Sequence, residues 1–312
     1  MNIVALAGGV GGAKLAHGLA QILTPAELTL VVNTGDDFEH LGLHIAPDLD
    51  TVMYTLAGLA NPETGWGQRH ETWSFMDALE RLGGPTWFRL GDRDLATHVE
   101  RTRRLRAGQS LTHVTAALGA ALGVRHPILP MSDHAVRTWV DTEEGELEFQ
   151  EYFVHRRCRP RVRAVRFAGL EAAAPAPAVL EALDAADLVV FCPSNPFLSL
   201  DPILSLPGLR ERVRARPVVA VSPIVGGQAI KGPAAKLLSE LGLDVSATAV
   251  AGHYRDLLTG FVLDTVDAGL AADVEALGPA TRVTDTVMRS DDDRARLAEA
   301  TLDFARSLRA AR

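Results

Sequence analysis

The feature that most constrains the fold of this chain is a run of glycines that directly follows an apolar segment. Residues 3–7 are apolar, as in a buried strand, and residues 15–23 carry leucine, alanine and isoleucine at helical spacing. A second apolar segment covers residues 28–32. Strand, helix and strand in this order predict a parallel sheet with helices on its faces. The glycines between the first strand and the helix are Gly8, Gly9, Gly11 and Gly12.

The same alternation returns in the second half of the chain. Residues 188–192 and 218–221 are apolar runs typical of buried strands, and each precedes a segment that we expect to be helical. Residues 245–250 are a further strand candidate. Residues 291–312 have the spacing of an amphipathic helix.

A mainly helical region separates these two halves. Apolar spacing predicts four helices there, at 51–59, 71–82, 95–106 and 111–122. Residues 136–154 alternate around Gly145 as a hairpin does. We therefore expect one Rossmann-like α/β domain over residues 1–312. Its doubly wound, mostly parallel sheet is interrupted by a helical insertion at about 48–125 and a hairpin at about 136–155.

Charge and cysteine content narrow the class of function. The net charge of -8 argues against a nucleic-acid binder, because such proteins need basic surface to displace counterions. No apolar run approaches the roughly 20 residues of a membrane helix, and the first residues lack the basic lead of a signal peptide. Cys158 and Cys192 match no metal or redox spacing, so we expect free thiols and a cytoplasmic location. We interpret the six arginines between 155 and 166 as part of a solvated strand in preference to an anion site.

The glycine-rich stretch itself predicts an anion site. Glycine lets backbone amides approach an anion closely, and a helix start adds unpaired N–H groups and a positive dipole end. Lys14 adds a charge, but Leu15 follows it where a Walker A loop needs Ser or Thr. Lys14 also stands at the last glycine position of the dinucleotide pattern. We therefore expect a nucleotide or phosphate site, without support for an ATPase or a nicotinamide oxidoreductase. The alternative is a tight glycine turn that binds no ligand.

Polar turns follow the other predicted strands. In open α/β sheets, ligands bind in the crevice at the carboxyl ends of the strands, so turns at one sheet edge describe one site. An acidic residue after the second strand commonly meets a ribose hydroxyl, and it can also hold a metal or belong to an Asp-rich turn. The side chains in these turns are Asn33, Thr34, Asp36, Ser194, Asn195 and Ser222.

Two charged stretches in the helical region are further candidates. Asp48 and Asp50 precede a predicted helix, so Asp50 is either its N-cap or a ligand for Mg²⁺, an ion that prefers hard oxygen ligands. Arg89 and Arg93 either face phosphates or an acidic substrate, or form ion pairs at a helix start that Asp94 caps.

Taken in order, these motifs resemble the 2-phospho-L-lactate transferase family of coenzyme F-420 biosynthesis. The resemblance extends over nearly the whole chain, and the motifs in its middle are specific. It is carried by residues 7–15, 32–37, 47–52, 90–98, 128–133, 193–196, 221–224 and 232–234.

The resemblance implies a Mg²⁺-dependent transferase with two small-molecule substrates. The donor is a guanosine diphosphate that carries a phospholactate-type group, and the acceptor is the deazaflavin FO. The ribityl hydroxyl of FO attacks the phosphorus that bears the acid, and GMP leaves. The acid is lactate, enolpyruvate or glycerate. Phosphoryl-type transfer relies on positioning and charge neutralisation more than on covalent help from the protein.

The family also implies roles for particular residues. The glycines and Lys14 would face the donor diphosphate, and the polar turns after the strands would hold guanosine or its phosphates. Asp50 matches the acceptor and metal position, where it would bind Mg²⁺ or orient the attacking hydroxyl. Arg89 stands where the family often has a basic acceptor-site lysine. The insertion at 48–125 would form the deazaflavin pocket, and its tryptophans would either stack on a ring or pack in a core. These tryptophans are Trp66, Trp73 and Trp87.

One alternative within the same fold is a homologous regulatory protein that binds a nucleotide sugar without transferring it. The Asp48–Asp50 and Arg89–Asp94 stretches favour the transferase. We expect a homodimer, the commonest closed assembly of soluble chains.

Overall fold

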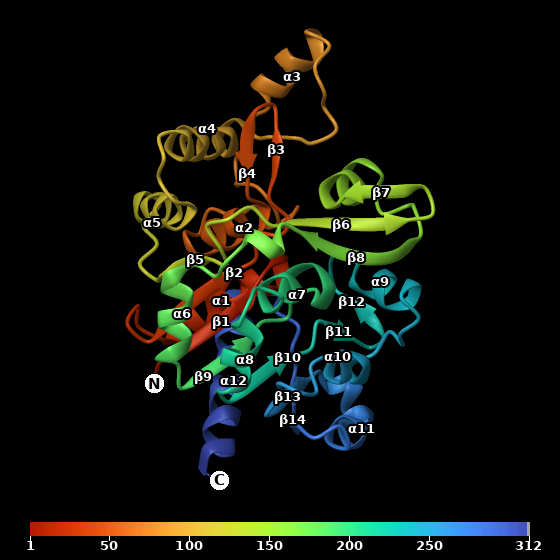
Figure 1. Ribbon diagram of the computed structural model, residues 1–312. Helices are drawn as coiled ribbons and strands as arrows, with labels where there is room; N and C mark the ends of the chain where they lie inside the picture. Colours follow the sequence, from red (N-terminus) through yellow and green to blue (C-terminus); the bar gives the residue numbers. More distant parts are fainter. Residues whose placement is uncertain (311–312) are drawn as a thin grey trace.

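The computed structural model describes residues 1–310, and its centre is a sheet of seven parallel strands. The strand order is β14-β13-β10-β9-β1-β2-β5 (Figure 1). This order confirms the predicted doubly wound parallel sheet. The strands are β1 Ile3–Ala7, β2 Leu28–Val32, β5 Ile128–Pro130, β9 Leu188–Phe191, β10 Val218–Val221, β13 Gly260–Leu263 and β14 Ala280–Val283.

Both faces of this sheet are covered, which explains why its strands are continuous apolar runs. Val4 and Leu6 of β1 belong to one buried cluster, whereas Ile3, Ala5 and Ala7 belong to another on the opposite face. The first cluster is completed by α6 Pro177–Asp184, α8 Leu209–Arg214, α9 Ala234–Glu240 and α10 Ala247–His253. The second is completed by α1 Gly9–Ile22, α2 Pro47–Leu56, α5 Leu111–Ala121 and α12 Asp291–Ala310.

The first and last helices of the described chain pack tightly on one another. A Cβ atom on Gly18 of α1 would lie only 2.1 Å from the carbonyl oxygen of Arg294 in α12. Only glycine therefore permits this approach of the two backbones. The predicted C-terminal helix is confirmed over 291–310, and its last two predicted positions lie outside the described residues.

The helical region stands above the sheet in Figure 1, with α3 Ser74–Arg81 farthest away. The four predicted helices are present, although α2 starts four residues early, at Pro47, a residue suited to a first helical turn. Ala46 is the N-cap of α2, so the interpretation of Asp50 as the cap is wrong. The hairpin of β3 Phe38–His40 and β4 Leu43–Ile45 and the helix α4 Asp92–Arg106 complete this region.

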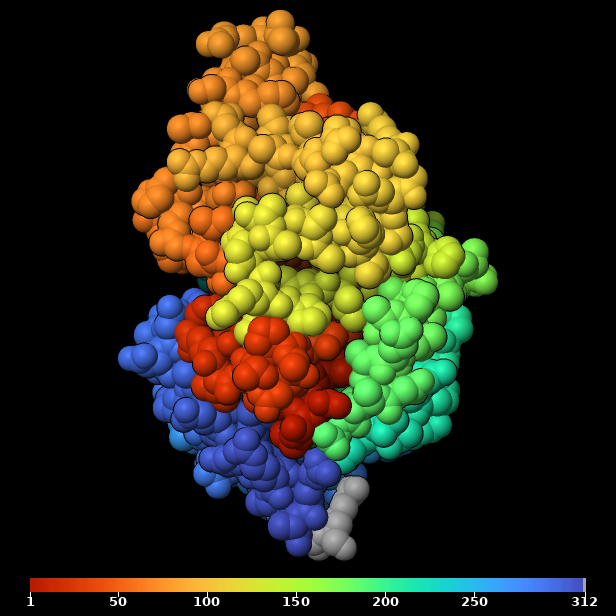
Figure 2. All heavy atoms as spheres, turned by 90° about the vertical axis from the view of Figure 1, so that its left-hand side faces the viewer, coloured from red at the N-terminus to blue at the C-terminus, as the bar shows by residue number. Residues whose placement is uncertain are grey.

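Figure 2 shows the same region from the side, with its atoms above those of the N-terminal segment and α12. Part of the region has a small core of its own. Phe38, Ile45, Met76 and Leu90 form this third buried cluster, apart from the two at the sheet.

A three-stranded antiparallel sheet lies beside the main one, in the order β7-β6-β8. Strands β6 Arg137–Thr142 and β7 Gly145–Glu148 confirm the predicted hairpin. A π-helical turn, Glu151–His155, replaces the end of its second arm. Strand β8 Val162–Ala168 holds part of the arginine-rich segment with exposed arginines, as the prediction of a solvated strand requires.

The expected strand at 245–250 is wrong, since this segment starts α10. The side chain of Ser246 accepts a hydrogen bond from the backbone N–H of Ala249 and caps the helix. The remaining regular elements are short: α7 Asp201–Leu204, α11 Ala271–Glu275, the 3₁₀ helices Leu170–Ala172 and Thr265–Leu270, a second π-helical turn Pro196–Leu200, and the hairpin of β11 Ile224–Val225 and β12 Gln228–Ala229. No helix among residues 1–310 is long and apolar enough to span a bilayer.

Candidate active site

A cavity of about 890 Å³, hereafter the pocket, lies at the carboxyl ends of β1, β2, β9 and β10. It brings together ten of the residues expected at the site: Gly8, Gly9, Gly11, Lys14, Asp36, Asp50, Arg89, Ser194, Asn195 and Ser222. Gly12, Asn33 and Thr34 are buried outside its lining. The turns after four separate strands therefore meet in one place, as parallel strands require.

The glycines form the start of helix α1 and not a free loop. The N–H of Gly8 donates to Ser194 Oγ at 3.1 Å, and the N–H of Gly9 donates to Asp48 Oδ1 at 2.7 Å. A Cβ atom on Gly11 would lie 2.3 Å from the carbonyl oxygen of Pro193. The glycines thus have a packing role, because they let the helix start touch the turn that follows β9. A carboxylate already occupies one of the amides at this helix start.

Lys14 lies on α1, and its side chain lines the pocket. Its Nζ donates to the carbonyl oxygen of Met288 at 2.8 Å. Burial, assisted by the charge of Arg294, lowers the pKa of this ammonium group. The hydrogen bond to Met288 therefore holds the Lys14 side chain at the pocket wall.

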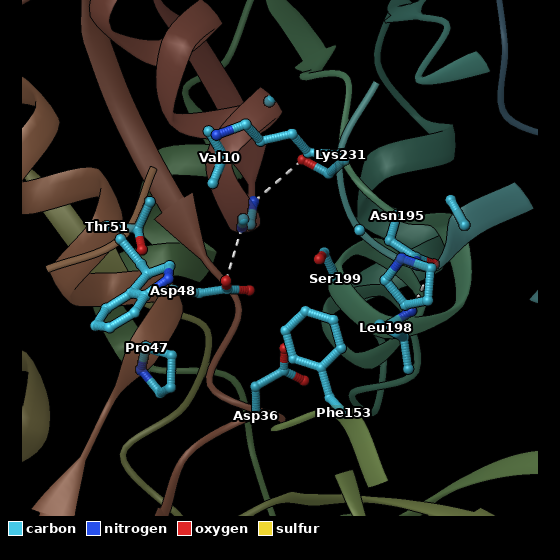
Figure 3. A pocket seen from close by; sticks show the side chains of 18 of the residues that line it. Val10, Asp36, Pro47, Asp48, Thr51, Phe153, Asn195, Leu198, Ser199 and Lys231 are labelled. Atoms are coloured by element: carbon cyan, nitrogen blue, oxygen red, sulfur yellow. Dashed lines mark hydrogen bonds between the residues drawn. The ribbon is translucent and has the colours of Figure 1, made fainter. Parts of the chain in front are cut away.

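Two carboxylates, Asp36 and Asp48, are directed into the pocket (Figure 3). Asp48 Oδ2 accepts a hydrogen bond from Asn33 Nδ2 at 2.9 Å, and burial raises the pKa of Asp48 to about 6. Burial and the neighbouring charge of Asp48 hold the pKa of Asp36 well above its usual range. Asp36 Oδ1 is buried without a hydrogen-bond partner among residues 1–310. Such a pair favours a shared proton or a bound cation.

Asp50 lies on the same wall but is engaged in a buried ion pair with Arg101, which is 1% exposed. Arg101 NH1 also lies 3.2 Å from His98 Nδ1, and His98 Nε2 faces Asp94 Oδ1 at 3.3 Å. Tyr54 donates its hydroxyl hydrogen to Asp94 at 2.7 Å. One network thus links the two charged stretches of the sequence, and it holds Asp50 rigidly at the pocket.

Ligand atoms of Asp50, Asp94 and His98 lie within 4.8 Å of one another, a spacing that suits a metal ion. The guanidinium of Arg101 already supplies a positive charge to Asp50. The carboxylates of Asp36 and Asp48 have no such cationic partner among residues 1–310. Asp36 and Asp48 therefore offer a divalent cation better electrostatic conditions than the group around Asp50.

The side of the pocket toward the helical region is aromatic. Trp66, Trp87 and Phe88 line it, and Trp73 instead stacks under the guanidinium of Arg89 at 4.2 Å from the ring centroid. Of the predicted acceptor residues, Arg89 thus lies at the pocket on an aromatic support. Phe149 and Phe153, stacked with ring centroids 5.3 Å apart, close the pocket from the π-helical turn.

Most side-chain polar groups in the turns after β9 and β10 form hydrogen bonds to the backbone of the same turn. Asn195 Oδ1 accepts from the N–H groups of Phe197 and Leu198, and Ser222 Oγ bonds to both backbone groups of Ile224. The Nδ2 of Asn195 is buried without a partner among residues 1–310. Asn195 therefore keeps a donor for a ligand, whereas Ser222 mainly shapes the turn.

Sequence reasoning missed several residues of this site. Asp48 belonged to a recognised motif, but only Asp50 in that motif was given a role. Arg101 and the two phenylalanines had no local signal, because an arginine on a helix and apolar residues near a hairpin are ordinary. Arg101 reaches the site from α4, and the two phenylalanines reach it from the segment that follows β7.

These features define an α/β protein with a deep pocket at its strand ends, in which helix-start amides and cations meet buried carboxylates and aromatic rings. A family model described as 2-phospho-L-lactate transferase CofD matches residues 3–299. The chain belongs to this CofD family, and the resemblance inferred from the motifs is confirmed.

Curated relatives match over almost their whole length. A phosphoenolpyruvate transferase of Streptomyces griseus is 47% identical over 99% of this chain and 100% of its own. A 2-phospho-L-lactate transferase of Methanosarcina mazei is 41% identical over 95% of this chain and 98% of its own. A solved UPF0052-family protein of Bacillus halodurans, 15% identical, superimposes with a TM-score of 0.62 over 96% of this chain and 98% of that one, which supports the fold.

Proposed function

We propose that this chain transfers a phosphate-linked three-carbon acid from a guanosine diphosphate-linked donor to the ribityl hydroxyl of the deazaflavin FO, in coenzyme F-420 biosynthesis. The observation that carries the proposal is one pocket with two chemically different ends. Helix-start residues, Lys14 and buried carboxylates form one end, and a wall of aromatic side chains with Arg89 forms the other. An anionic donor suits the first end, and a flat ring suits the second.

The reaction would join the two ends of the pocket. The hydroxyl oxygen of FO forms a bond to the phosphorus that bears the acid, and the bond from that phosphorus to the GMP oxygen breaks. GMP leaves with the electron pair, and the hydroxyl proton is released. Residues of the chain contribute by holding donor and acceptor in line, with Lys14 and the start of α1 facing the diphosphate.

Mg²⁺ fits this site as the cofactor, and we assign it to Asp36 and Asp48. Both carboxylates are buried, both have raised pKa values, and one oxygen of Asp36 has no partner among residues 1–310. All the ligand atoms are hard oxygens, which Mg²⁺ prefers. When bound, the ion would neutralise charge on the donor phosphates. Asp50, fixed by Arg101, would orient the acceptor hydroxyl from the same wall.

The first acid to test is enolpyruvate. The relatives named as phosphoenolpyruvate transferases are 43% to 47% identical to this chain, and the 2-phospho-L-lactate transferases are 39% to 41% identical. We place the reaction in the cytoplasm, because both cysteines are free thiols. The assembly that we propose is a homodimer, which light scattering of the purified protein would test.

A direct assay tests the activity. Purified protein is incubated with FO, Mg²⁺ and guanylylated phosphoenolpyruvate or phospholactate, and GMP and the deazaflavin product are separated by anion exchange. We expect GMP and a more acidic deazaflavin in equal amounts, and no turnover when EDTA removes the metal. A protein that turns over none of these donors but binds a UDP-sugar tightly would be a regulatory homologue instead.

A further inference from the structure

The arginine-rich segment 155–166 contains one residue that the proposed reaction has not used. Arg157 lines the pocket, whereas the other five arginines of the segment do not. Arg156 pairs with Glu144 and Glu151, and Arg166 pairs with Glu146. Arg157 takes part in no ion pair or side-chain hydrogen bond within residues 1–310. A free guanidinium at a pocket wall is available for an anionic ligand.

The backbone that carries this arginine is strained. Arg157 and the next residue, Cys158, have φ angles of 52° and 53°, in the left-handed region that residues with a side chain rarely adopt. The segment is held there by two backbone bonds: the N–H of Arg156 donates to Glu151 at 2.8 Å, and that of Cys158 donates to the buried Tyr152 at 3.0 Å. Glycine would be the less costly residue at such a helix end. Strain of this kind is concentrated at ligand sites.

The remaining cations of the pocket already have partners. These cations are Lys14, which donates to Met288, Lys231, which donates to the carbonyl oxygen of Thr64, Arg289, which pairs with Asp285, and Arg89, which stacks on Trp73. Arg157 comes from a different element, the end of the π-helical turn that also carries the pocket residue Phe153. In Figure 3, Phe153 lies beside Asp36, across the pocket from Val10 at the start of α1.

From this placement we infer that Arg157 binds the carboxylate of the acid that is transferred. The inference rests on the proposed function. The donor has two kinds of anionic group, and its diphosphate is already assigned to the start of α1 and Lys14. The planar fork of a guanidinium matches a carboxylate with two parallel hydrogen bonds, which makes Arg157 a selector for donors that carry the acid.

The variant Arg157→Gly separates this role from a structural one. Glycine adopts a φ of 52° without strain, so the variant should unfold at the same temperature as the wild type or higher. Calorimetry with Mg²⁺ present would measure the binding of guanylylated phosphoenolpyruvate and of GDP, which lacks the carboxylate. We expect donor binding to weaken at least tenfold and GDP binding to change less than twofold. Arg157→Lys should fall between, and Arg163→Gln, an exposed arginine outside the pocket, should match the wild type.

Three results would overturn the inference. Unchanged donor binding by Arg157→Gly shows that the guanidinium does not contact the donor. Equal losses for GDP and the donor assign it to phosphate, and a higher KM for FO alone assigns it to the acceptor. In each of these cases the wild type still turns over, so the proposed function stands. A wild type that binds neither nucleotide removes the proposed function and this inference together.

Discussion

At the scale of single residues, the site is built at a cost in stability. Burial raises the pKa of both Asp36 and Asp48, and the charge of Asp48 raises the pKa of Asp36 further. Burying a second like charge is unfavourable unless a cation accompanies it. In the metal-free protein, the two carboxylates should therefore lower the free energy of unfolding. A bound ion should remove this loss of stability.

Replacing Asp36 with asparagine should stabilise the metal-free protein and abolish transfer. The folded state holds protons on these carboxylates that the unfolded state, with a pKa near 3.8, has already released. The free energy of unfolding of the wild type should therefore fall as pH rises from about 4 through 6. In urea melts with EDTA, we expect Asp36→Asn to be about 1–3 kcal/mol more stable at pH 8 and to have a flatter pH profile. A variant that is less stable than wild type at pH 8 would contradict this account.

A mutation in the ion pair between Asp50 and Arg101 should lower the stability of the protein, whereas Asp36→Asn should raise it. Removal of Arg101 leaves the charge of Asp50 buried without its partner. We expect Arg101→Ala to cost about 3–5 kcal/mol in chemical denaturation. Arg103→Ala, which breaks an exposed pair with Glu100 on the same helix, is the matched control and should change stability little. Similar losses in the two variants would show that α4 itself, and not the buried pair, is sensitive.

At the scale of elements, the start of α1 both packs against the turn after β9 and lines the pocket. Its glycines bring the helix against the turn after β9, and the same approach places its amides at the pocket. A Cβ atom at Gly8, Gly11 or Gly12 would lie within 2.5 Å of a neighbouring atom, so these three positions have no room for a side chain. Three of the four glycines line the pocket, but sequence reasoning attributed to ligand approach what is partly helix-to-turn contact.

Gly11→Ala tests this contact. Its Cβ would lie 2.3 Å from the carbonyl oxygen of Pro193, so the helix or the turn must shift, at about 1–3 kcal/mol. Gly119→Ala in α5 is the control, because its Cβ would meet nothing closer than Val124 at 3.9 Å and alanine favours a helix. Thermal melts should show a lower Tm for the first variant and an equal or higher Tm for the second. Equal behaviour would mean that the turn after β9 is free to move.

The sequence predicts best those strands that are buried on both faces. Strands β1, β2 and β10 are buried on both faces, so an unbroken apolar run identifies each of them. Three-residue strands such as β3 and β4 are too short for any period to show. The run at 245–250 is a helix because Ser246 caps it, and a six-residue run alone does not decide between the two states. The turns at the strand ends were predictable, whereas Arg101 and Phe153 reach the pocket through contacts distant in sequence.

At the scale of the whole molecule, the helical region is less firmly held than the sheet. Helix α3 buries only Met76, and the neighbouring Leu82 is 85% exposed. The strands of the main sheet, in contrast, lie between two large buried clusters. Regions with few buried contacts open with lower free energy than the core.

Hydrogen exchange should reveal this difference directly. We expect amides of α3 to exchange at least about 100-fold faster than those of β1 and β10. Mass spectrometry of peptic fragments resolves the three segments, and an FO analogue at saturating concentration should slow exchange around Trp87 and Phe88, which line the pocket. Uniform exchange rates across α3 and the sheet would show that the molecule unfolds only as one unit.

The close crossing of α1 and α12 also sets an order of events during synthesis. Strand β1 needs β9, about 185 positions later, as its neighbour, and α1 needs the backbone near Arg294 to fill the space at Gly18. Strand β1 and helix α1 are therefore synthesised well before β9 and α12, against which they pack. Until residues 291–310 emerge, the side of α1 that packs on α12 stays uncovered, and this exposed surface is open to wrong partners in the nascent chain.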